Sequence, residues 1–394
     1  MSYEIRVLSI PDIKAAQQEI ELIGPDNGGK ILMQNKLLHR VIKVRGLRPE
    51  AATIIKQEML GRGAEAVTCR GVINCSAPKS DILMSGTVKQ YQEVAKKLLM
   101  QPFGLKELAK DILQALDNTV KPMQKTTKCS KKEFNWGSRT YIMGILNLTP
   151  DSFSDGGRFN NFDKALYQAE KMVKDGADII DIGGESTRPG YEKISDEEEI
   201  ARISPVLEAL AKELAVPISV DTYKSGVAKA ALELGADMLN DIWGLLADPA
   251  LADLAAEYKV PIILMHNQDG TQYDSMMDDI LTSLRKSIAI AKNAGVPDDM
   301  IILDPGIGFG KDVAQNIATM RHLEDFKTLG YPILLGTSRK SLIGKTLDLP
   351  ANERIEGTGA TVALGIAKGA ADIIRVHDVK EMARVAKMTD AMVR

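Results

Sequence analysis

The strongest constraint on the fold is a regular alternation of short apolar runs and helical stretches from Tyr141 to the C-terminus. Each run has the length of a strand and is followed by turn residues and then by apolar residues at helical spacing. The predicted strands are Tyr141–Leu146, Ala177–Ile182, Pro217–Val220, Met238–Leu239 running into Ile242, Pro261–Met265, Met300–Leu303, Pro332–Leu335 and Asp372–Val376. Eight βα units over residues 139–394 match a closed parallel (β/α)8 barrel, which takes about 250 residues. An open doubly wound sheet is the alternative, and the even repeats favour closure.

Helices are predicted between these strands and after the last one. Their predicted ranges are Asp163–Lys174, Glu197–Leu214, Ser225–Leu234, Leu251–Tyr258, Ile280–Ala294, Ala314–Thr328, Gly357–Lys368 and Val379–Met392. The barrel and its helices account for residues 139–394. The rest of the chain therefore has to form something else.

Residues 1–117 predict a separate small α/β domain. Its predicted strands are Tyr3–Leu8, Leu37–Val44, Ala66–Cys69 and Ile82–Ser85, and its predicted helices are Pro11–Ile23, Pro49–Leu60, Val88–Met100 and Leu105–Leu116. No catalytic constellation occurs in it, which favours a structural or oligomerising role. Residues 118–138 are rich in Lys and Thr and lack a clear period, so we expect a solvated linker between the domains.

Composition excludes several classes of protein. Fifty Lys and Arg against 53 Asp and Glu leave a net charge of −3, which is no basic field for nucleic acid. No run of about 18 apolar residues predicts a membrane span, and the first residues lack the apolar core of a secretion signal. Three cysteines and four histidines at scattered positions predict neither a disulfide framework nor a zinc site. We expect a soluble, cytoplasmic protein.

Polar side chains follow all of the predicted barrel strands, where the strand ends of a barrel meet at one mouth. In strand order they are Asn147 with Thr149 and Asp151, Asp181 with Glu185–Arg188, Asp221–Thr222, Asn240–Asp241, His266–Asn267, Asp304, Ser338–Ser341, and Arg375 with His377–Asp378. A lone Asp or Asn after a strand is usually a helix cap or a turn residue. Eight polar strand ends with mixed charge are better explained by a binding site.

The residue types at this mouth divide into two kinds of binding group. Asp221, Asn240 and Asp304 offer acceptors and an amide at buried strand ends, which suits a flat heterocycle with several N–H donors. Lys340, Arg375 and His377 suit an anionic phosphate group. Gly-rich loops after the first two strands are of the kind that closes over a site.

Two glycine-containing segments resemble phosphate loops but fail their spacing. Gly306–Lys311 reads GIGFGK, which is not G-x-G-x-x-G and does not open a dinucleotide-binding unit. Gly344–Thr346 ends like a P-loop, but Arg339 stands where the first glycine is required.

The segments at the mouth resemble the dihydropteroate synthase family closely. They are MGILNLTPDSFSDGGRF at 143–159, DIGGESTRPG at 181–190, ISVDTYK at 218–224, LNDI at 239–242, ILDPGIGFGK at 302–311, GTSRKS at 336–341 and RVHDV at 375–379. They recur in the family's order and span the chain from about residue 138 to its end. Residues 1 to about 130 are not covered, because a typical family member lacks so long an extension.

The resemblance implies a reaction and a role for each matching residue. The family joins a magnesium-bound dihydropterin-methyl diphosphate to 4-aminobenzoate, releases diphosphate, commonly forms homodimers and is a sulfonamide target. By this resemblance Asp221, Asn240, Met265, Asp304 and Lys340 line the pterin pocket, and Asn147 helps to hold Mg²⁺. Thr187, Arg375 and His377 bind the diphosphate, and Arg188, Pro189, Phe309 and Ser341 frame the aminobenzoate.

The implied chemistry is dissociative. Diphosphate leaves, and a cationic methylene carbon remains on the pterin near Asp151 until the aminobenzoate amine attacks. Asp151, Asp221, Asp304 and Lys340 are the predicted catalytic residues. Two alternatives remain: a methyltetrahydrofolate-binding methyltransferase barrel, which needs no diphosphate grip, and a pterin-binding barrel without activity. Release of diphosphate discriminates between them and the synthase.

Overall fold

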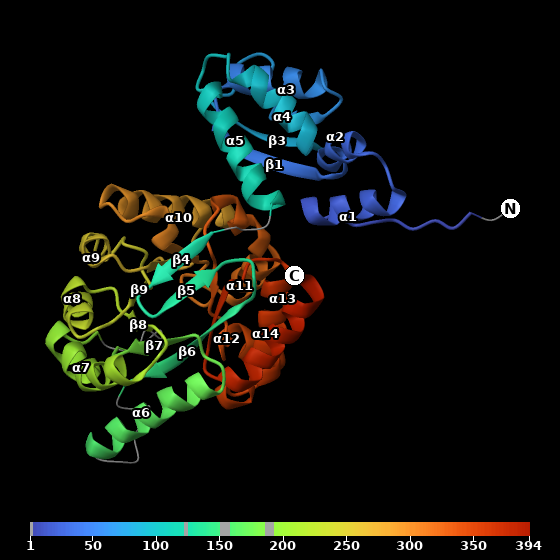
Figure 1. Cartoon of the computed structure of the whole chain (residues 1–394). Coiled ribbons are helices and arrows are strands. Elements are labelled where there is room, and N and C mark those ends of the chain that lie inside the picture. The colour runs from blue at the N-terminus through green and yellow to red at the C-terminus, as the bar shows by residue number, and fades with distance from the viewer. Residues whose placement is uncertain (1–2, 122–124, 150–157, 186–192) are drawn as a thin grey trace. The chain divides into compact units, whose positions relative to one another are not determined.

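The computed structural model describes residues 3–121, 125–149, 158–185 and 193–394, with the side chains of 158–161 left aside. The chain divides into two compact units, Met1–Met123 and Gln124–Arg394 (Figure 1). The predicted Asp151, Thr187, Arg188 and Pro189 lie outside the described residues. Within the described ranges, no helix is long and apolar enough to span a membrane.

The C-terminal unit is built on a sheet of eight parallel strands in the order β11-β10-β9-β8-β7-β6-β13-β12. An isolated parallel bridge between Leu303 and Ile333 joins the two ends of that order and closes the barrel. The prediction of a (β/α)8 barrel of the TIM type is thereby confirmed. The strands are β6 (Tyr141–Asn147), β7 (Ile179–Gly183), β8 (Ile218–Asp221), β9 (Met238–Asp241), β10 (Ile262–Met265), β11 (Ile301–Asp304), β12 (Leu334–Leu335) and β13 (Ile373–Val376).

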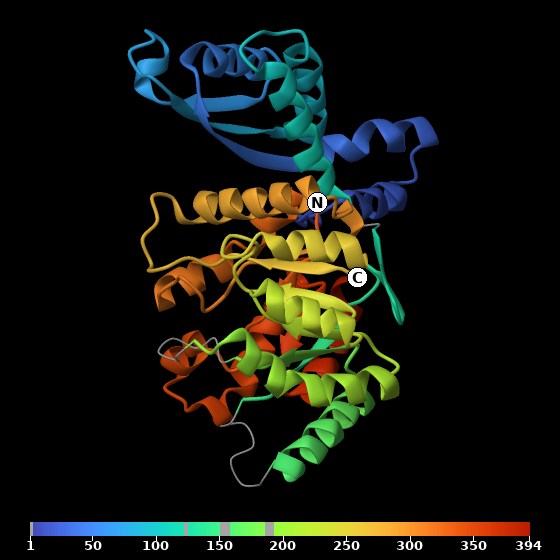
Figure 2. The same cartoon turned by 90° about the vertical axis from the view of Figure 1, so that its left-hand side faces the viewer.

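Helices surround this barrel, as Figure 1 and Figure 2 show from two sides. They are α6 (Arg158–Lys174), α7 (Asp196–Glu213), α8 (Ser225–Glu233), α9 (Ala250–Tyr258), α10 (Met276–Asn293), α11 (Val313–Arg321), α12 (Ser341–Leu347), α13 (Ile355–Ala367) and α14 (Val379–Val393). Each strand is apolar on both faces because one face fills the barrel and the other meets the helices. In α7, for example, Ile203, Leu207 and Leu210 are buried in the same core as Ile180 and Ile218.

Three aspartates at the N-terminal end of the barrel tie neighbouring strands together. Asp178 accepts a hydrogen bond from the Ile142 amide at 3.0 Å, and Asp237 accepts one from Ile218 at 2.9 Å. Asp372 does the same for Ile333 at 2.9 Å. Each carboxylate satisfies an amide at the start of a buried strand, where an unpaired group would be costly.

The predicted linker over 118–138 is wrong for most of its length. Helix α5 (Leu105–Val120) continues into its start, and β4 (Thr126–Cys129) and β5 (Lys132–Asn135) form an antiparallel hairpin of the C-terminal unit. Phe134 and Trp136 are buried and their rings stack at 5.3 Å. The Lys and Thr content concealed this short strand alternation, in which every second side chain turns inward.

The hairpin is fastened to the N-terminal end of the barrel by polar contacts. Thr127 donates to the carbonyl of Asp299 at 2.5 Å and accepts from the Trp136 indole at 2.8 Å. Lys132 forms an ion pair with Asp178, and Ser130 donates a hydrogen bond to Asp237. The hairpin therefore belongs to the folded barrel unit.

The N-terminal unit is a three-stranded antiparallel sheet in the order β1-β3-β2 with helices packed on it. Its elements are α1 (Ile13–Ile23), α2 (Asn27–Leu37), β1 (His39–Leu47), α3 (Pro49–Leu60), β2 (Glu65–Thr68), β3 (Ser80–Thr87), α4 (Val88–Leu98) and α5. Met59, Tyr91 and Leu98 are fully buried in its core. A capping box of Thr87 and Gln90 begins α4 directly after β3.

Two details of this unit differ from the sequence prediction. Residues 3–8 alternate like a strand, yet they form no strand, and Tyr3, Ile5 and Val7 are exposed. Helix α2 was not predicted, because it contains Gly28 and Gly29 and has weak amphipathic periodicity. Asp26 caps it by accepting a hydrogen bond from the Gly29 amide at 2.6 Å.

Candidate active site

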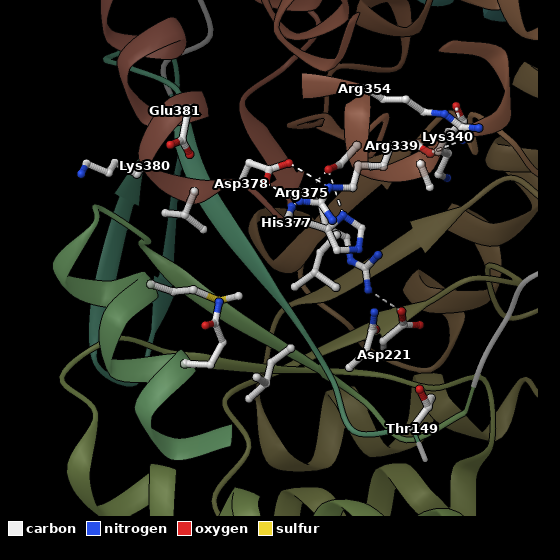
Figure 3. A pocket seen from close by; sticks show the side chains of 18 of the residues that line it. Thr149, Asp221, Arg339, Lys340, Arg354, Arg375, His377, Asp378, Lys380 and Glu381 are labelled. Atoms are coloured by element: carbon white, nitrogen blue, oxygen red, sulfur yellow. Dashed lines mark hydrogen bonds and ion pairs between the residues drawn. The ribbon is translucent and has the colours of Figure 1, made fainter. Parts of the chain in front are cut away.

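The C-terminal ends of the barrel strands open into a cavity of about 1200 Å³. Seven of the predicted site residues line it: Asn147, Asp221, Phe309, Lys340, Ser341, Arg375 and His377. They come from five places in the barrel, namely the ends of β6, β8 and β13 and the loops after β11 and β12. Figure 3 shows several of these side chains converging on the cavity.

Arg375 of β13 links two carboxylates across this mouth. Its Nε donates to Asp181 and its Nη2 to Asp221, both at 2.6 Å, and Figure 3 shows the second pair. Asn240 donates to the same oxygen of Asp181 at 3.2 Å. Among the described residues, Asp181 Oδ1 and Asp221 Oδ1 are buried without a hydrogen-bond partner. Such atoms are costly unless a ligand supplies the missing donors.

Asp181 is a site residue to which the sequence assigned no role. It was recognised as the polar end of the second strand, but strand ends do not reveal which side chains bond to one another. Its side chain is fully buried and holds both Arg375 and Asn240. In the register of the two strands Asp181 stands beside Ser219, and Asp221 stands beside Gly183.

Burial strongly perturbs the ionisable groups at the mouth. Burial raises the pKa of Asp221 to about 7, although Arg375 opposes the shift, and nearby Asp181 adds to it. Burial likewise raises the pKa of Asp304, against the attraction of Lys340. The pKa of Lys340 falls to about 8, chiefly because its ammonium is buried. Several perturbed groups in one cleft are typical of a functional site.

Asp304 and Met265 lie side by side at two strand ends, although they and Asn240 are not among the residues that line the cavity. They are register partners at the ends of β11 and β10, and each is largely buried. Asp304 Oδ1 accepts the Gly306 amide at 2.7 Å. Gly336 has no side chain, and a Cβ at its position would lie 3.8 Å from Asp304 Oδ2. The ends of β11 and β10 thus place a buried carboxylate beside an apolar side chain, a combination that ligand sites commonly use.

A second cluster surrounds His377 at the end of β13. Its Nδ1 lies 2.9 Å from the Ser338 hydroxyl, which also accepts the His377 amide at 3.1 Å. Arg339 binds the neighbouring Asp378 through two nitrogens, and Figure 3 shows this pair. The backbone of Arg339 has φ +57°, so the turn after β12 is held in a strained conformation. These contacts fix His377 at the edge of the cavity.

A buried ion cluster beside the mouth was not predicted. Lys224 Nζ donates to Glu185, to Glu199 at 2.9 Å and to the Ile194 carbonyl at 2.7 Å. Tyr223 adds a hydrogen bond to Glu185 at 3.1 Å. The sequence predicts Glu185 at the mouth of the barrel, but no sequence pattern pairs Glu185 with Lys224.

The donors for a divalent cation are sparse. Among the described residues, no group of three or more His, Cys, Asp or Glu side chains could hold a metal ion. Asn147 at the end of β6 lines the cavity and has an amide oxygen to offer. Mg²⁺ is commonly bound by one or two protein oxygens together with substrate phosphates. The amide oxygen of Asn147 thus fits the protein part of such a site.

The chain resembles known proteins over its barrel unit. Residues 143–377 match the family model described as pterin binding enzyme. A dihydropteroate synthase of Clostridium beijerinckii is 60% identical over 267 residues, covering 68% of this chain and 99% of that protein. A crystal structure of the dihydropteroate synthase of Clostridium difficile, solved in the presence of pteroic acid, superposes with a TM-score of 0.65. It is 55% identical and covers 66% of this chain and 99% of that one.

One further relative matches the N-terminal unit as well. A probable bifunctional folylpolyglutamate synthase/dihydropteroate synthase of Halobacterium salinarum is 39% identical over 396 residues. The match covers 98% of this chain and 47% of that protein. The extension therefore has a counterpart in a larger protein, while the Clostridium beijerinckii relative matches over almost its whole length with only about two thirds of this chain.

Proposed function

This chain belongs to the dihydropteroate synthases of the pterin-binding enzyme family, and from that premise we propose the reaction it performs. It condenses (7,8-dihydropterin-6-yl)methyl diphosphate with 4-aminobenzoate, giving 7,8-dihydropteroate and diphosphate. The observation that carries this proposal is the group of buried acceptors at the barrel strand ends, among which Asp221 keeps one oxygen without a partner among the described residues. A pterin ring carries N–H groups along one edge that would satisfy them.

The pterin edge is assigned to Asp304, Asp221 and Asn240. Asp304 accepts from the ring amide and the exocyclic amine, and Asp221 and Asn240 complete the polar wall. Met265 packs against the ring, and Lys340 donates from the opposite side. Support comes from the burial of these groups, because a hydrogen bond to a buried carboxylate discriminates strongly against ligands that lack the donor.

The diphosphate is assigned to Arg375 and His377, with Thr187 from the segment outside the described residues. Arg375 is held by Asp181 and Asp221, so its guanidinium is oriented before any substrate arrives. When bound, Mg²⁺ on the diphosphate would be held by Asn147 and would neutralise the charge of the leaving group.

Bond cleavage follows from this charge arrangement. The carbon–oxygen bond to diphosphate breaks, its electron pair leaves with the diphosphate, and the methylene carbon becomes cationic. Asp151 is assigned to stabilise that carbon, and the aminobenzoate amine then attacks it and loses a proton. Arg188, Pro189, Phe309 and Ser341 are assigned to hold the aminobenzoate ring and carboxylate, which places a sulfonamide in direct competition with it.

Release of diphosphate tests the proposal. The full chain is mixed with dihydropterin-methyl diphosphate and Mg²⁺, with and without 4-aminobenzoate, and diphosphate is measured. Aminobenzoate-dependent release supports the synthase. Pterin binding without release would favour a pterin-binding barrel without activity, and methyl transfer from methyltetrahydrofolate would favour a methyltransferase.

A shortened chain that begins at Lys125 tests the role of the first unit. The cut has to precede the β4–β5 hairpin, because that hairpin is packed on the barrel. We expect the shortened chain to keep most of the activity, since the Clostridium beijerinckii relative has no counterpart for about a third of this chain. Activity confined to the full chain would make the first unit part of the working enzyme.

Assembly and location complete the proposal. The family resemblance supports a homodimer, which light scattering after size-exclusion chromatography would measure. The cysteines are free, and Cys69 and Cys75 are exposed, which agrees with a reducing cytoplasm. Cell fractionation tests the location.

A further inference from the structure

The loop Gly306–Gly310, which follows β11, is folded with its carbonyl groups turned inward. Gly306, Gly308 and Gly310 have φ of +68°, +86° and +55°, a region that favours glycine. A Cβ on Gly306 would lie 1.9 Å from the His266 carbonyl oxygen, so the backbones approach each other too closely for any side chain. The loop therefore encloses groups that its inward carbonyls can bind, and it does not present its amides to a phosphate.

Two lysine ammonium groups occupy the inside of this loop. Lys340 donates to the Ile307 carbonyl. Lys311 donates to the Gly306 carbonyl at 3.0 Å and to the Phe309 carbonyl at 3.1 Å. Its third contact is His266 Nδ1, at 3.0 Å. Lys311 is only 8% exposed, and its three contacts match the three donors of an ammonium group.

The two lysines differ in what they can do when substrate is present. Lys340 is assigned to the pterin, and its ammonium lies 4.2 Å from the centroid of the Phe309 ring. Lys311 has no assigned substrate contact, and the described groups that its ammonium contacts are the loop carbonyls and His266. Its hold on the carbonyls of Gly306 and Phe309 is thus independent of the pterin, whereas that of Lys340 is not.

His266 connects this loop to the pterin wall. It directly follows Met265 at the end of β10, and its amide donates to the Asp304 carbonyl at 3.0 Å. Burial and the neighbouring Lys311 charge lower the pKa of His266 to about 3, so the ring is neutral. Burial lowers the pKa of Lys311 to about 7. In its ammonium form the group only donates, so Nδ1 is then the acceptor and Nε2 carries the hydrogen.

We propose that Lys311 is a positioning residue that holds the Gly306–Gly310 loop, and with it Phe309, in the geometry that receives 4-aminobenzoate, and that it ties this loop to β10 through His266. The inference rests on the proposed function, which assigns Phe309 to the aminobenzoate. Lys311 acts through the loop and does not touch substrate. Its loss should therefore weaken the binding of 4-aminobenzoate more than that of the pterin, which Lys311 reaches only through His266 and the loop.

The test compares three variants of the full chain. Lys311→Met removes the three donors at similar length, Lys311→Arg keeps a charged donor, and Lys229→Met on the exposed face of α8 is the matched control. Steady-state kinetics give KM for each substrate, and calorimetry gives the affinity for a pterin without phosphate. A sulfonamide inhibition constant reports the same aminobenzoate pocket without turnover.

For Lys311→Met we expect KM for 4-aminobenzoate and the sulfonamide inhibition constant to rise about tenfold or more. KM for the pterin diphosphate and the affinity for a pterin without phosphate should stay within about twofold of the wild type, because Lys311 has no assigned contact with the pterin. Lys311→Arg should recover part of the loss, and Lys229→Met should match the wild type.

Equal changes for both substrates, or none, would overturn the positioning role. If Lys311→Met does not fold, the changes in KM for the two substrates are compared in Lys311→Arg instead, and that comparison tests the positioning role. Failure of the proposed function is distinguishable, because the wild type itself would then release no aminobenzoate-dependent diphosphate.

Discussion

The two ends of the barrel carry the same residue type in opposite states. At the N-terminal end, Asp178 and Asp237 each bind a strand amide and groups of the β4–β5 hairpin. At the C-terminal end, Asp181 and Asp221 keep one buried oxygen each without a partner among the described residues. An aspartate that stabilises the fold accepts hydrogen bonds from the protein, whereas one that binds a ligand keeps an acceptor for that ligand.

Charge follows the same division. Although burial alone would raise it, hydrogen bonds from Arg139 and Lys132 keep the pKa of Asp178 below its usual value. At the other end, burial outweighs Arg375 and raises the pKa of Asp221 to about 7. Asp372 departs from the pattern, because burial raises its pKa despite the Ile333 amide. Asp178 and Asp237 thus contribute to stability at one end of the barrel, whereas Asp181 and Asp221 keep unsatisfied binding potential at the other.

The largest expected effect comes from Asp304→Asn. The amide presents a donor where the pterin edge needs an acceptor, so kcat/KM for the pterin diphosphate should fall about 100- to 1000-fold. The unfolding midpoint should stay the same or rise, since a buried carboxylate is removed. Unchanged activity would remove Asp304 from the pterin pocket.

Asp178→Asn is the matched change at the other end. Removing the charge leaves Arg139 and Lys132 without their partner, and we expect a loss of about 3 kcal/mol in the free energy of unfolding. Denaturant titration measures it. Turnover per folded molecule should stay near the wild type, and a specific loss of turnover would break the division between the two ends.

Arg375→Ala separates the two halves of the substrate. Affinity for a pterin diphosphate should fall about tenfold more than affinity for a pterin without phosphate, because a charge-assisted contact is lost only in the first case. Calorimetry with both ligands measures the difference. Equal losses would mean that Arg375 serves the carboxylates and not the diphosphate.

Asp221→Asn should alter how stability depends on pH. The folded pKa of about 7 exceeds the unfolded value of 3.8, so the folded state holds more protons between these limits. In the wild type, the contribution of this group is present at low pH and is lost as pH rises to about 7. The variant lacks that loss, so its free energy of unfolding should rise relative to that of the wild type as the pH increases from 4 to 7. A constant difference across this range would contradict the raised pKa.

Much of the barrel could be predicted because each strand is buried on both faces and reads as an apolar run. The same runs located the polar strand ends, including Asp221, Asp304 and Arg375. Partners could not be predicted in this way: the bonds of Arg375 to Asp181, of Lys224 to Glu185 and of Lys311 to His266 join residues far apart in the chain.

The errors arose where local pattern and tertiary context disagree. Residues 3–8 alternate like a strand, but alternation provides no neighbouring strand to pair with. The hairpin was missed because its strands are short and Lys-rich, although Phe134 and Trp136 marked an inward face. Lys311 ends a segment that resembles a phosphate loop but fails its spacing. Its burial, which the sequence does not reveal, is the observation that indicates its role.

The most direct test of the central claim is the unfolding midpoint of the wild type, Asp304→Asn and Asp178→Asn, each with and without a pterin ligand. We predict that the ligand raises the midpoint equally in the wild type and in Asp178→Asn, whose own midpoint starts lower, and that it leaves Asp304→Asn unchanged. A ligand shift that survives in Asp304→Asn and disappears in Asp178→Asn would place the pterin at the wrong end of the barrel and contradict the account.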